Sequence, residues 1–217
     1  MRWVNMTAFI TRCWKKLGFE LGRSFARLLS VAVLGLNCAW AQTSSVDLIE
    51  LTPSYQNEAL LLNTQLNLTL GPAVEDALVK GLAVHFVVDA EVLQDRWYWT
   101  DKKVGAASRY YRLAFQPLTR RWRLNVSSEP ISSTGLASSI SQSFDTLAEA
   151  LNVVRRQTAW KIADLRKLDL RSSQQIRYRF KLDVSQLPRP FQIAAGNQAD
   201  WNLQVRQTIS LNLLEGR

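Results

Sequence analysis

Hydrophobic and polar residues alternate along several stretches of this chain, which is the pattern of β-strands with one buried side and one side facing solvent. The clearest stretch is 82–92, in which the even-numbered positions from Val84 to Val92 are all hydrophobic. Because half-buried strands of this kind are typical of antiparallel sheets, the sequence predicts a mainly β fold, an antiparallel β-sandwich of about eight strands. The other expected strands cover 46–51, 60–70, 110–116, 121–126, 159–165, 176–182 and 201–213.

Two segments have helical patterns instead. The first follows Gly71-Pro72 and ends before Gly81, so that proline stands at the start of the helix and glycine just beyond its end. The second covers 144–157, where hydrophobic residues recur at helical spacing. We therefore expect one short helix and one longer helix within the sandwich. The hydrophobic stripe of the longer one is Leu147, Ala150, Leu151 and Val154.

Proline and serine mark the expected breaks between these elements. Pro53-Ser54 is expected to end the first strand, and the segment Leu187–Pro190 to end the strand over 176–182, because proline cannot donate to a sheet ladder. The Ser-rich segment 127–143 is expected to be an exposed loop.

The segment 110–126 is expected to form a β-hairpin with a basic, solvent-facing side. The four residues from Gln116 to Thr119 can form its turn, since Pro117 presets the backbone at the second turn position. This turn would place Arg112 directly opposite Arg123. Like charges in such a pair destabilise a sheet.

Two sources of compensation for this charge pair are open. Asp89 and Glu91 lie on the polar side of the strand over 82–92 and would be counter-charges if that strand is a neighbour. Alternatively, an external anion would bind the two arginines.

Basic residues are concentrated in two regions. The net charge is +9, and residues 1–41 hold six of the 27 Lys and Arg residues but one of the 18 acidic residues. Residues 96–126 hold eight Lys and Arg residues and a single acid, Asp101. The basic hairpin is therefore the candidate binding face, with an ordinary solvated face as the alternative. The candidate binding residues are Arg112, Arg121, Arg123, Tyr98 and Tyr110.

Residues 1–41 have the features of a signal peptide. A basic segment, 1–27, precedes an apolar segment, 28–36, that is short for a membrane span. Ala39-Trp40-Ala41 fits the pattern of small residues before a cleavage site, which predicts cleavage between Ala41 and Gln42 and a single β-sandwich domain over 42–217. An uncleaved N-terminal anchor and a start at Met6 are the alternatives. Either way the folded part is expected in the periplasm.

The sequence carries no motif for catalysis or for a cofactor, such as a P-loop, a nucleophile elbow or a dinucleotide-binding turn. The single histidine, His85, could build a catalytic triad only with Asp89 on the same strand face, an unsuitable geometry. Asp89 and Glu91 are also poorly spaced for glycoside hydrolysis. Both cysteines, Cys13 and Cys38, lie in the leader, and no metal-ligand cluster follows. We therefore expect a protein that is not an enzyme and has no cofactor, no metal and no nucleic-acid partner.

Three segments carry a resemblance to a known group of proteins: RWYW at 96–99, YRLAFQPLTRRWRL at 111–124 and RYRFKLDVSQLPRPF at 177–191. They resemble a proteobacterial family of exported proteins of unknown function. Genes of that family often stand beside one for a nitrogen-regulation type sensor histidine kinase. The resemblance implies a compartment and an architecture, and it suggests the periplasmic part of such a kinase as one partner. It implies no activity.

These observations lead to two hypotheses about function. The first is an exported accessory or interaction protein, whose basic hairpin face meets an acidic protein surface or an anionic component of the envelope. The second is a periplasmic module that binds a lipid or a glycan in a pocket at one end of the sandwich.

Overall fold

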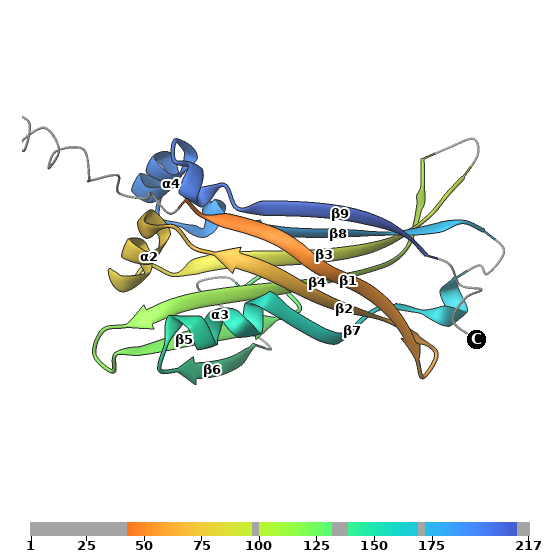
Figure 1. Ribbon diagram of the computed structural model, residues 1–217, viewed down its shortest axis with the longest axis horizontal. Coiled ribbons are helices and arrows are strands. Elements are labelled where there is room, and N and C mark those ends of the chain that lie inside the picture. The colour runs from red at the N-terminus through yellow and green to blue at the C-terminus, as the bar shows by residue number, and fades with distance from the viewer. Residues whose placement is uncertain (1–42, 97–99, 132–138, 169–171, 212–217) are drawn as a thin grey trace, which may run out of the picture. The chain divides into compact units, whose positions relative to one another are not determined.

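The computed structural model describes residues 43–96, 100–131, 139–168 and 172–211, all within one compact unit, Gln42–Arg217. The described strands form two antiparallel sheets (Figure 1). The fold is therefore the expected β-sandwich, with nine strands described. The small sheet has the order β1 (Ser45–Gln56), β2 (Ala59–Thr69), β7 (Arg156–Asp164). The large sheet has the order β6 (Ile140–Phe144), β5 (Arg121–Ser127), β4 (Lys102–Gln116), β3 (Val84–Gln94), β8 (Gln174–Leu182), β9 (Gln204–Leu211).

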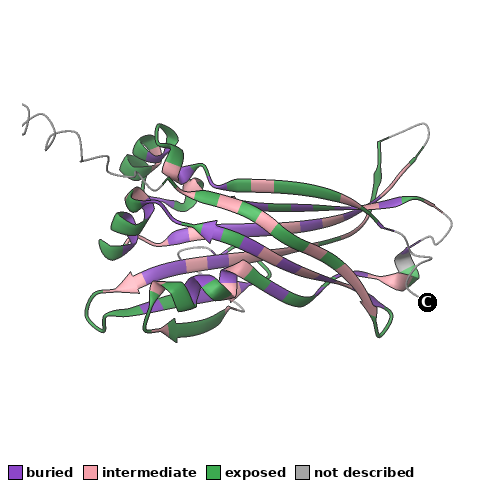
Figure 2. Cartoon of the chain, viewed as in Figure 1, coloured by how far each residue is buried: buried purple, intermediate pink, exposed green. Residues whose placement is uncertain are grey.

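The core lies between the facing sides of the two sheets, where the alternation of the strands places their hydrophobic residues. On β3 every even-numbered residue from Val84 to Val92 is buried, as the sequence predicts. Phe86 stacks on Phe180 of β8 with their ring centroids 5.7 Å apart. Buried and exposed residues alternate along the strands in Figure 2. Each large side chain buried in this way contributes on the order of 1.5–3 kcal/mol to the stability of the fold.

The two sheets come closest where β4 crosses β7. Gly105 stands on the inward side of β4, and a Cβ atom at this position would lie 2.5 Å from the Cβ of Ala163. That separation is shorter than any ordinary contact between carbon atoms. The close approach of the sheets therefore depends on glycine at this position.

Helices lie at one end of the sandwich and beside the large sheet. The short helix expected after Gly71 is α2 (Pro72–Val79), and its first turn is capped from a distant part of the chain. A carboxylate oxygen of Asp200 accepts a hydrogen bond from the backbone N–H of Ala73 at 3.4 Å, and the other oxygen accepts one from Ser44 at 3.2 Å. This carboxylate joins the start of β1, α2 and the C-terminal part of the fold.

The longer helix, α3 (Leu147–Arg155), is shorter than the 144–157 expected from its pattern. It begins after Thr146, whose side chain caps Glu149, and it ends because β7 begins at Arg156. A third helix, α4 (Arg189–Gly196), was not expected, since the prolines around it indicated only the end of a strand. Pro190 stands in its first turn, a position where a helix accepts proline.

Two expected breaks are wrong. Strand β1 continues through Pro53 to Gln56, because β1 is an edge strand and proline is tolerated there. The Ser-rich segment contains an additional strand, β6, at the other edge of the large sheet. Its central residues are small and polar, so no hydrophobic alternation marked it in the sequence.

Candidate functional site

The β4–β5 hairpin has a different register from the expected one. Its loop is Pro117–Arg120, closed by the pair Gln116 and Arg121, so each strand position is shifted by two residues relative to its partner. Arg112 therefore lies opposite Asn125, and the expected opposition of Arg112 to Arg123 is wrong. A shift of two residues keeps every side chain on its own face of the sheet, since the side-chain period of a strand is two.

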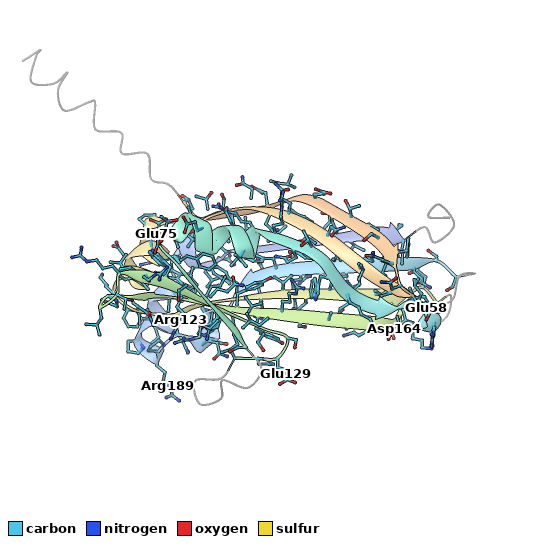
Figure 3. The ribbon with its side chains drawn as sticks, turned by 90° about the horizontal axis from the view of Figure 1, so that it is seen from below. Glu58, Glu75, Arg123, Glu129, Asp164 and Arg189 are labelled. Atoms are coloured by element: carbon cyan, nitrogen blue, oxygen red, sulfur yellow. The ribbon has the colours of Figure 1, made fainter. Side chains whose placement is uncertain are left out.

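The predicted binding residues fall into two groups on the outward side of the hairpin. Arg121 and Arg123 lie near its loop, and Arg121 forms an exposed ion pair with Asp145 at 3.0 Å. Figure 3 shows Arg123 on the side of the large sheet that faces away from β1 and β2. Arg112 and Tyr110 lie farther along β4, opposite His85 and Val87 of β3. The remaining predicted binding residue, Tyr98, and the predicted cleavage residues, Ala41 and Gln42, lie outside the described residues.

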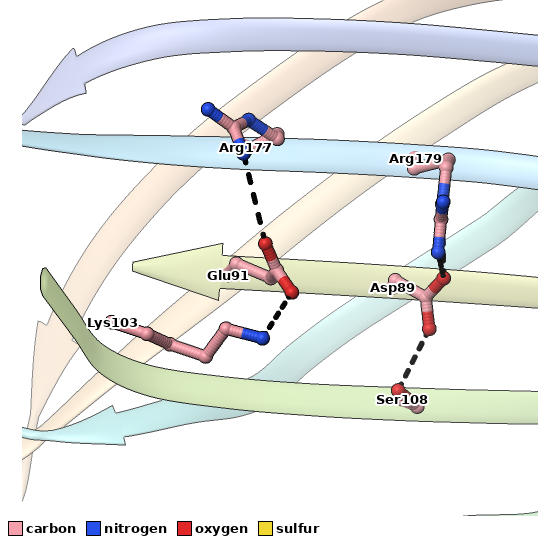
Figure 4. A network of polar contacts seen from close by, with 6 residues as sticks. All are labelled: Asp89, Glu91, Lys103, Ser108, Arg177 and Arg179. Atoms are coloured by element: carbon pink, nitrogen blue, oxygen red, sulfur yellow. Dashed lines mark hydrogen bonds and ion pairs between the residues drawn. The ribbon is translucent and has the colours of Figure 1, made fainter. Parts of the chain in front are cut away.

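The acids of β3 compensate different cations from the ones expected. Strand β3 pairs with β4 on one side and with β8 on the other. Asp89 accepts hydrogen bonds from Arg179 of β8, at 2.6 and 3.1 Å, and from the hydroxyl of Ser108 at 2.8 Å (Figure 4). We expected the acids of β3 to be counter-charges for Arg112 and Arg123 of the hairpin, and this expectation is wrong. The main cationic partner of Asp89 is Arg179, which comes from β8.

Glu91 is used in a similar way, one step along the same face. It forms an ion pair with Lys103 of β4, and Arg177 of β8 lies 3.9 Å from its other oxygen. Three of the cations on this side of the sheet are thus held by two carboxylates (Figure 4).

Four cations on the same side form no ion pair in the part of the chain that the structure describes. Two of them, Arg112 and Arg123, belong to the hairpin, and Lys181 and Arg206 belong to β8 and β9. Arg206 lies directly opposite Arg179, so the large sheet does place two arginines in register, although not the pair expected. We call the outward side of the large sheet around Arg112, Arg123, Lys181 and Arg206 the outer basic face.

A cavity of about 330 Å³ opens on the outer basic face. Its lining includes His85 and buried Val87 of β3, Tyr110 of β4, Lys181 of β8 and buried Ile131 from the segment after β5. One predicted binding residue, Tyr110, and a cation of β8, Lys181, are therefore brought together around the single histidine.

His85 is in an unusual electrostatic position within this cavity. Burial, with a smaller effect from the charge of Arg112, lowers the pKa of its imidazole to about 4, although the carboxylate of Asp183 acts in the opposite direction. Its Nδ1 atom is buried and has no hydrogen-bond partner among the described residues. Asp89, the carboxylate that a triad would need, is instead bound to Arg179 and Ser108.

A second concavity lies between the two sheets. This groove has a volume of about 630 Å³ and is lined from β7 and the end of α3 on one side and from β4, β5 and β6 on the other. Its lining includes Arg109 of β4, whose guanidinium carbon lies 5.2 Å from the centre of the Trp160 ring. We did not predict this residue as part of a site.

A signal for Arg109 was nevertheless present in the sequence. Tyr111, Leu113 and Phe115 form the hydrophobic alternation of β4, and Arg109 stands in phase with them. Arg109 is therefore expected on the buried side of its strand. A cation on that side must either lie in the core or line an opening.

The described residues contain neither a candidate metal site nor a membrane-spanning helix. In residues 43–96, 100–131, 139–168 and 172–211, no group of three or more His, Cys, Asp and Glu side chains is arranged to hold a metal ion. Within the same residues, no helix has both the length and the hydrophobicity needed to cross a membrane.

Fold and surface together define a β-sandwich protein with a polar, cation-rich outer sheet face and a groove between its sheets. Residues 41–212 match the family described as Domain of unknown function (DUF4390), and the chain belongs to that family. No curated protein and no solved structure matches the chain.

Proposed function

We propose that this protein is an exported interaction protein whose outer basic face binds an acidic surface of a partner. One observation carries the proposal: β4, β5, β8 and β9 each contribute a cation that forms no ion pair with a described residue. Cations that are gathered on one face of a sheet attract an acidic partner and raise its association rate.

The compartment and the absence of catalysis are part of the same proposal. The basic and apolar segments of residues 1–41 support export to the periplasm. An accessory role without chemistry is supported by the use of Asp89 and Glu91 as partners of cations on the sheet. The partner suggested by the resemblance is the periplasmic part of a sensor histidine kinase.

Charge reversal on the outer basic face tests this proposal. The double variant Lys181→Glu and Arg206→Glu changes one lysine and one arginine on β8 and β9. The matched control, Lys80→Glu and Arg166→Glu, makes the same change in charge after α2 and after β7, where both residues are exposed. The protein, expressed from the full chain so that any leader is processed, would be used to capture partners from envelope extract.

We expect the first variant and high salt to abolish capture, because exposed charges are screened over about 3 Å at 1 M salt. The control variant should capture the partner as well as the unchanged protein does. If the partner is still captured by the double variant, and is also still captured by the unchanged protein at high salt, the proposal is contradicted.

A second candidate function is the binding of a lipid or a glycan. The groove of about 630 Å³ between the sheets favours it, because its volume lies in the range of small-molecule sites. This groove is a lateral opening lined by both sheets, whereas the sequence pointed to a pocket at one end of the sandwich.

A further inference from the structure

We propose that the groove between the sheets binds an anionic amphiphile, a molecule with a carboxylate or phosphate group on an alkyl chain, and that Arg109 binds the anionic group. This inference deepens the second candidate function and rests on it. It does not depend on the outer basic face, which lies on the opposite side of the large sheet.

Arg109 is a cation on the side of β4 that otherwise carries core residues. It lies on the inward side of β4, in phase with buried Tyr111 and Leu113, and its side chain is only partly exposed. Its neighbours are aromatic: its guanidinium lies over the ring of Trp160, and its charge opposes the rise that burial causes in the pKa of Tyr111. No carboxylate forms an ion pair with Arg109 in the described residues.

A partly buried guanidinium without a carboxylate is costly, because the loss of hydration is not repaid by an opposite charge. The cation–π contact with Trp160 supplies on the order of 0.5–2 kcal/mol. An anionic group from a ligand would supply the missing charge through paired, charge-assisted hydrogen bonds, for which the planar guanidinium is well suited.

The rim of the groove is also cationic. Its described lining includes Arg156 and Lys161 of β7 beside Arg109, and it contains no aspartate or glutamate. Lys161 pairs with Asp164 outside this lining, whereas Arg156 forms no ion pair with a described residue. The groove therefore attracts anions and disfavours cations.

The remaining wall of the groove is mixed, with an apolar part beside polar residues such as Ser127, Gln142 and Thr158. Val126 of β5, Ile140 of β6 and Val153 of α3 line it, and the side chain of Ile140 is 67% exposed although it stands on the inward side of its strand. An alkyl chain lying along these residues would remove apolar surface from water. The groove thus combines an exposed hydrophobic residue, Ile140, with a cation, Arg109. An amphiphile needs both, the first for its alkyl chain and the second for its charged group.

The same contacts disfavour a neutral glycan. Sugars bind to aromatic side chains by stacking on an open ring face, but Trp160 is buried and one face of its ring carries Arg109. Among the ligands of the second candidate function, the structure therefore favours a lipid-like anion over a sugar.

The test compares ligands that share an alkyl chain and differ in charge. Sodium decanoate, decyl phosphate, decyltrimethylammonium and decyl maltoside would be titrated below their micellar concentrations into the protein expressed from the full chain, with calorimetry as the readout. We expect decanoate and decyl phosphate to bind and the ammonium compound not to bind. Inorganic phosphate, which has no tail, should bind at least tenfold more weakly than decyl phosphate, because it buries no alkyl chain.

Variants locate the binding. Arg109→Gln removes the charge and should weaken decanoate binding by about tenfold to a hundredfold, the range for loss of a charge-assisted hydrogen bond. Arg109→Lys keeps the charge and should retain part of the affinity. Ile140→Glu places an acid on the exposed rim, where folding is not at risk, and should weaken the anionic ligands while improving the ammonium compound. Arg123→Gln, on the outer basic face, is the matched control and should bind as the unchanged protein does.

The outcomes separate this inference from the function on which it rests. If decyl maltoside binds as tightly as decanoate and Ile140→Glu weakens both, the groove binds ligands but the preference for anions is wrong. If none of the four amphiphiles binds, the second candidate function and the inference both fail. Unchanged decanoate binding in a folded Arg109→Gln variant, or in Ile140→Glu, would place the binding elsewhere and overturn the inference.

Discussion

The outer basic face and the groove between the sheets both carry arginines, but the two regions treat them differently. On the outer face, the side chains of Arg179 and Arg177 are 45% and 44% exposed and lie next to carboxylates of β3. In the groove, Arg109 is partly buried and contacts aromatic side chains instead. The side of the sheet on which a polar group lies, more than its residue type, therefore decides what partners it requires. In the interior a missing partner is costly, whereas outside water replaces it.

The largest expected effect concerns the neutral polar group at the centre of the interior. Gln157 of β7 is buried, and its side-chain oxygen accepts hydrogen bonds from Thr64 and from Tyr178, the latter at 3.2 Å. Gln157→Leu would leave both hydroxyl groups buried without this partner. We expect the free energy of unfolding to fall by about 2–4 kcal/mol, measured by chemical denaturation.

The matched control on the outer side is Gln204→Leu, at an exposed position of β9. It should change the free energy of unfolding by less than about 0.5 kcal/mol. A similar loss in both variants would show that the interior is no more demanding than the outer face.

A second prediction concerns packing where the two sheets approach. In Gly105→Ala, the new methyl group would meet Ala163, so we expect a loss of about 1–3 kcal/mol in the free energy of unfolding. The control is Gly196→Ala at the end of α4, where a Cβ atom would meet nothing within 4 Å. An equal effect of the two changes on the denaturation midpoint would contradict the close approach of β4 and β7.

A third prediction concerns His85, a half-buried residue of the outer face. Because its pKa in the folded protein is lowered to about 4, protonation favours the unfolded chain, whose histidine has a pKa near 6.5. The stabilising effect of neutral His85 is therefore present above about pH 6.5 and is lost as the pH falls through 4.

We expect this loss to be about 1–2 kcal/mol after allowing for the exposed part of the ring. The measurement is the free energy of unfolding between pH 7 and pH 4 in the unchanged protein and in His85→Gln. The variant should lose less stability over this interval. Parallel curves for the two proteins would mean that His85 is not held neutral by the fold.

The smallest expected effect belongs to the ion pairs of the outer face. Asp89→Asn removes the charge that binds Arg179 and should lower the free energy of unfolding by less than about 1 kcal/mol. Asp145→Asn, which removes the more exposed partner of Arg121, should have an even smaller effect. Both effects should decrease in high salt. A loss at Asp89 that equals the loss at Gln157 would remove the contrast between the two regions.

The side of the sheet on which each residue lies could be predicted from the sequence alone. The buried inward positions of β3 and β8 follow from their alternation, whereas Val87 of β3 is buried on the outward side. The helix α3 follows from its hydrophobic stripe, although tertiary context decided where it ends. The reason is local: the direction of a side chain along a strand depends only on its position in a two-residue period.

The strand register and the strand order were decided by the tertiary structure. A two-residue shift in the β4–β5 hairpin leaves the alternation unchanged, so the pattern could not distinguish Arg112 opposite Asn125 from Arg112 opposite Arg123. The position of β8 beside β3, which brings Arg179 to Asp89, joins residues 90 positions apart in the chain. No local pattern contains that information.

The groove shows the same division between sequence and structure. The sequence placed Arg109 on the inward side of its strand, since it shares the phase of Tyr111. Only the packing of β7 against β4 and β5 decided that this side is open at Arg109 and closed at Leu113, because an opening between sheets depends on how two distant layers meet.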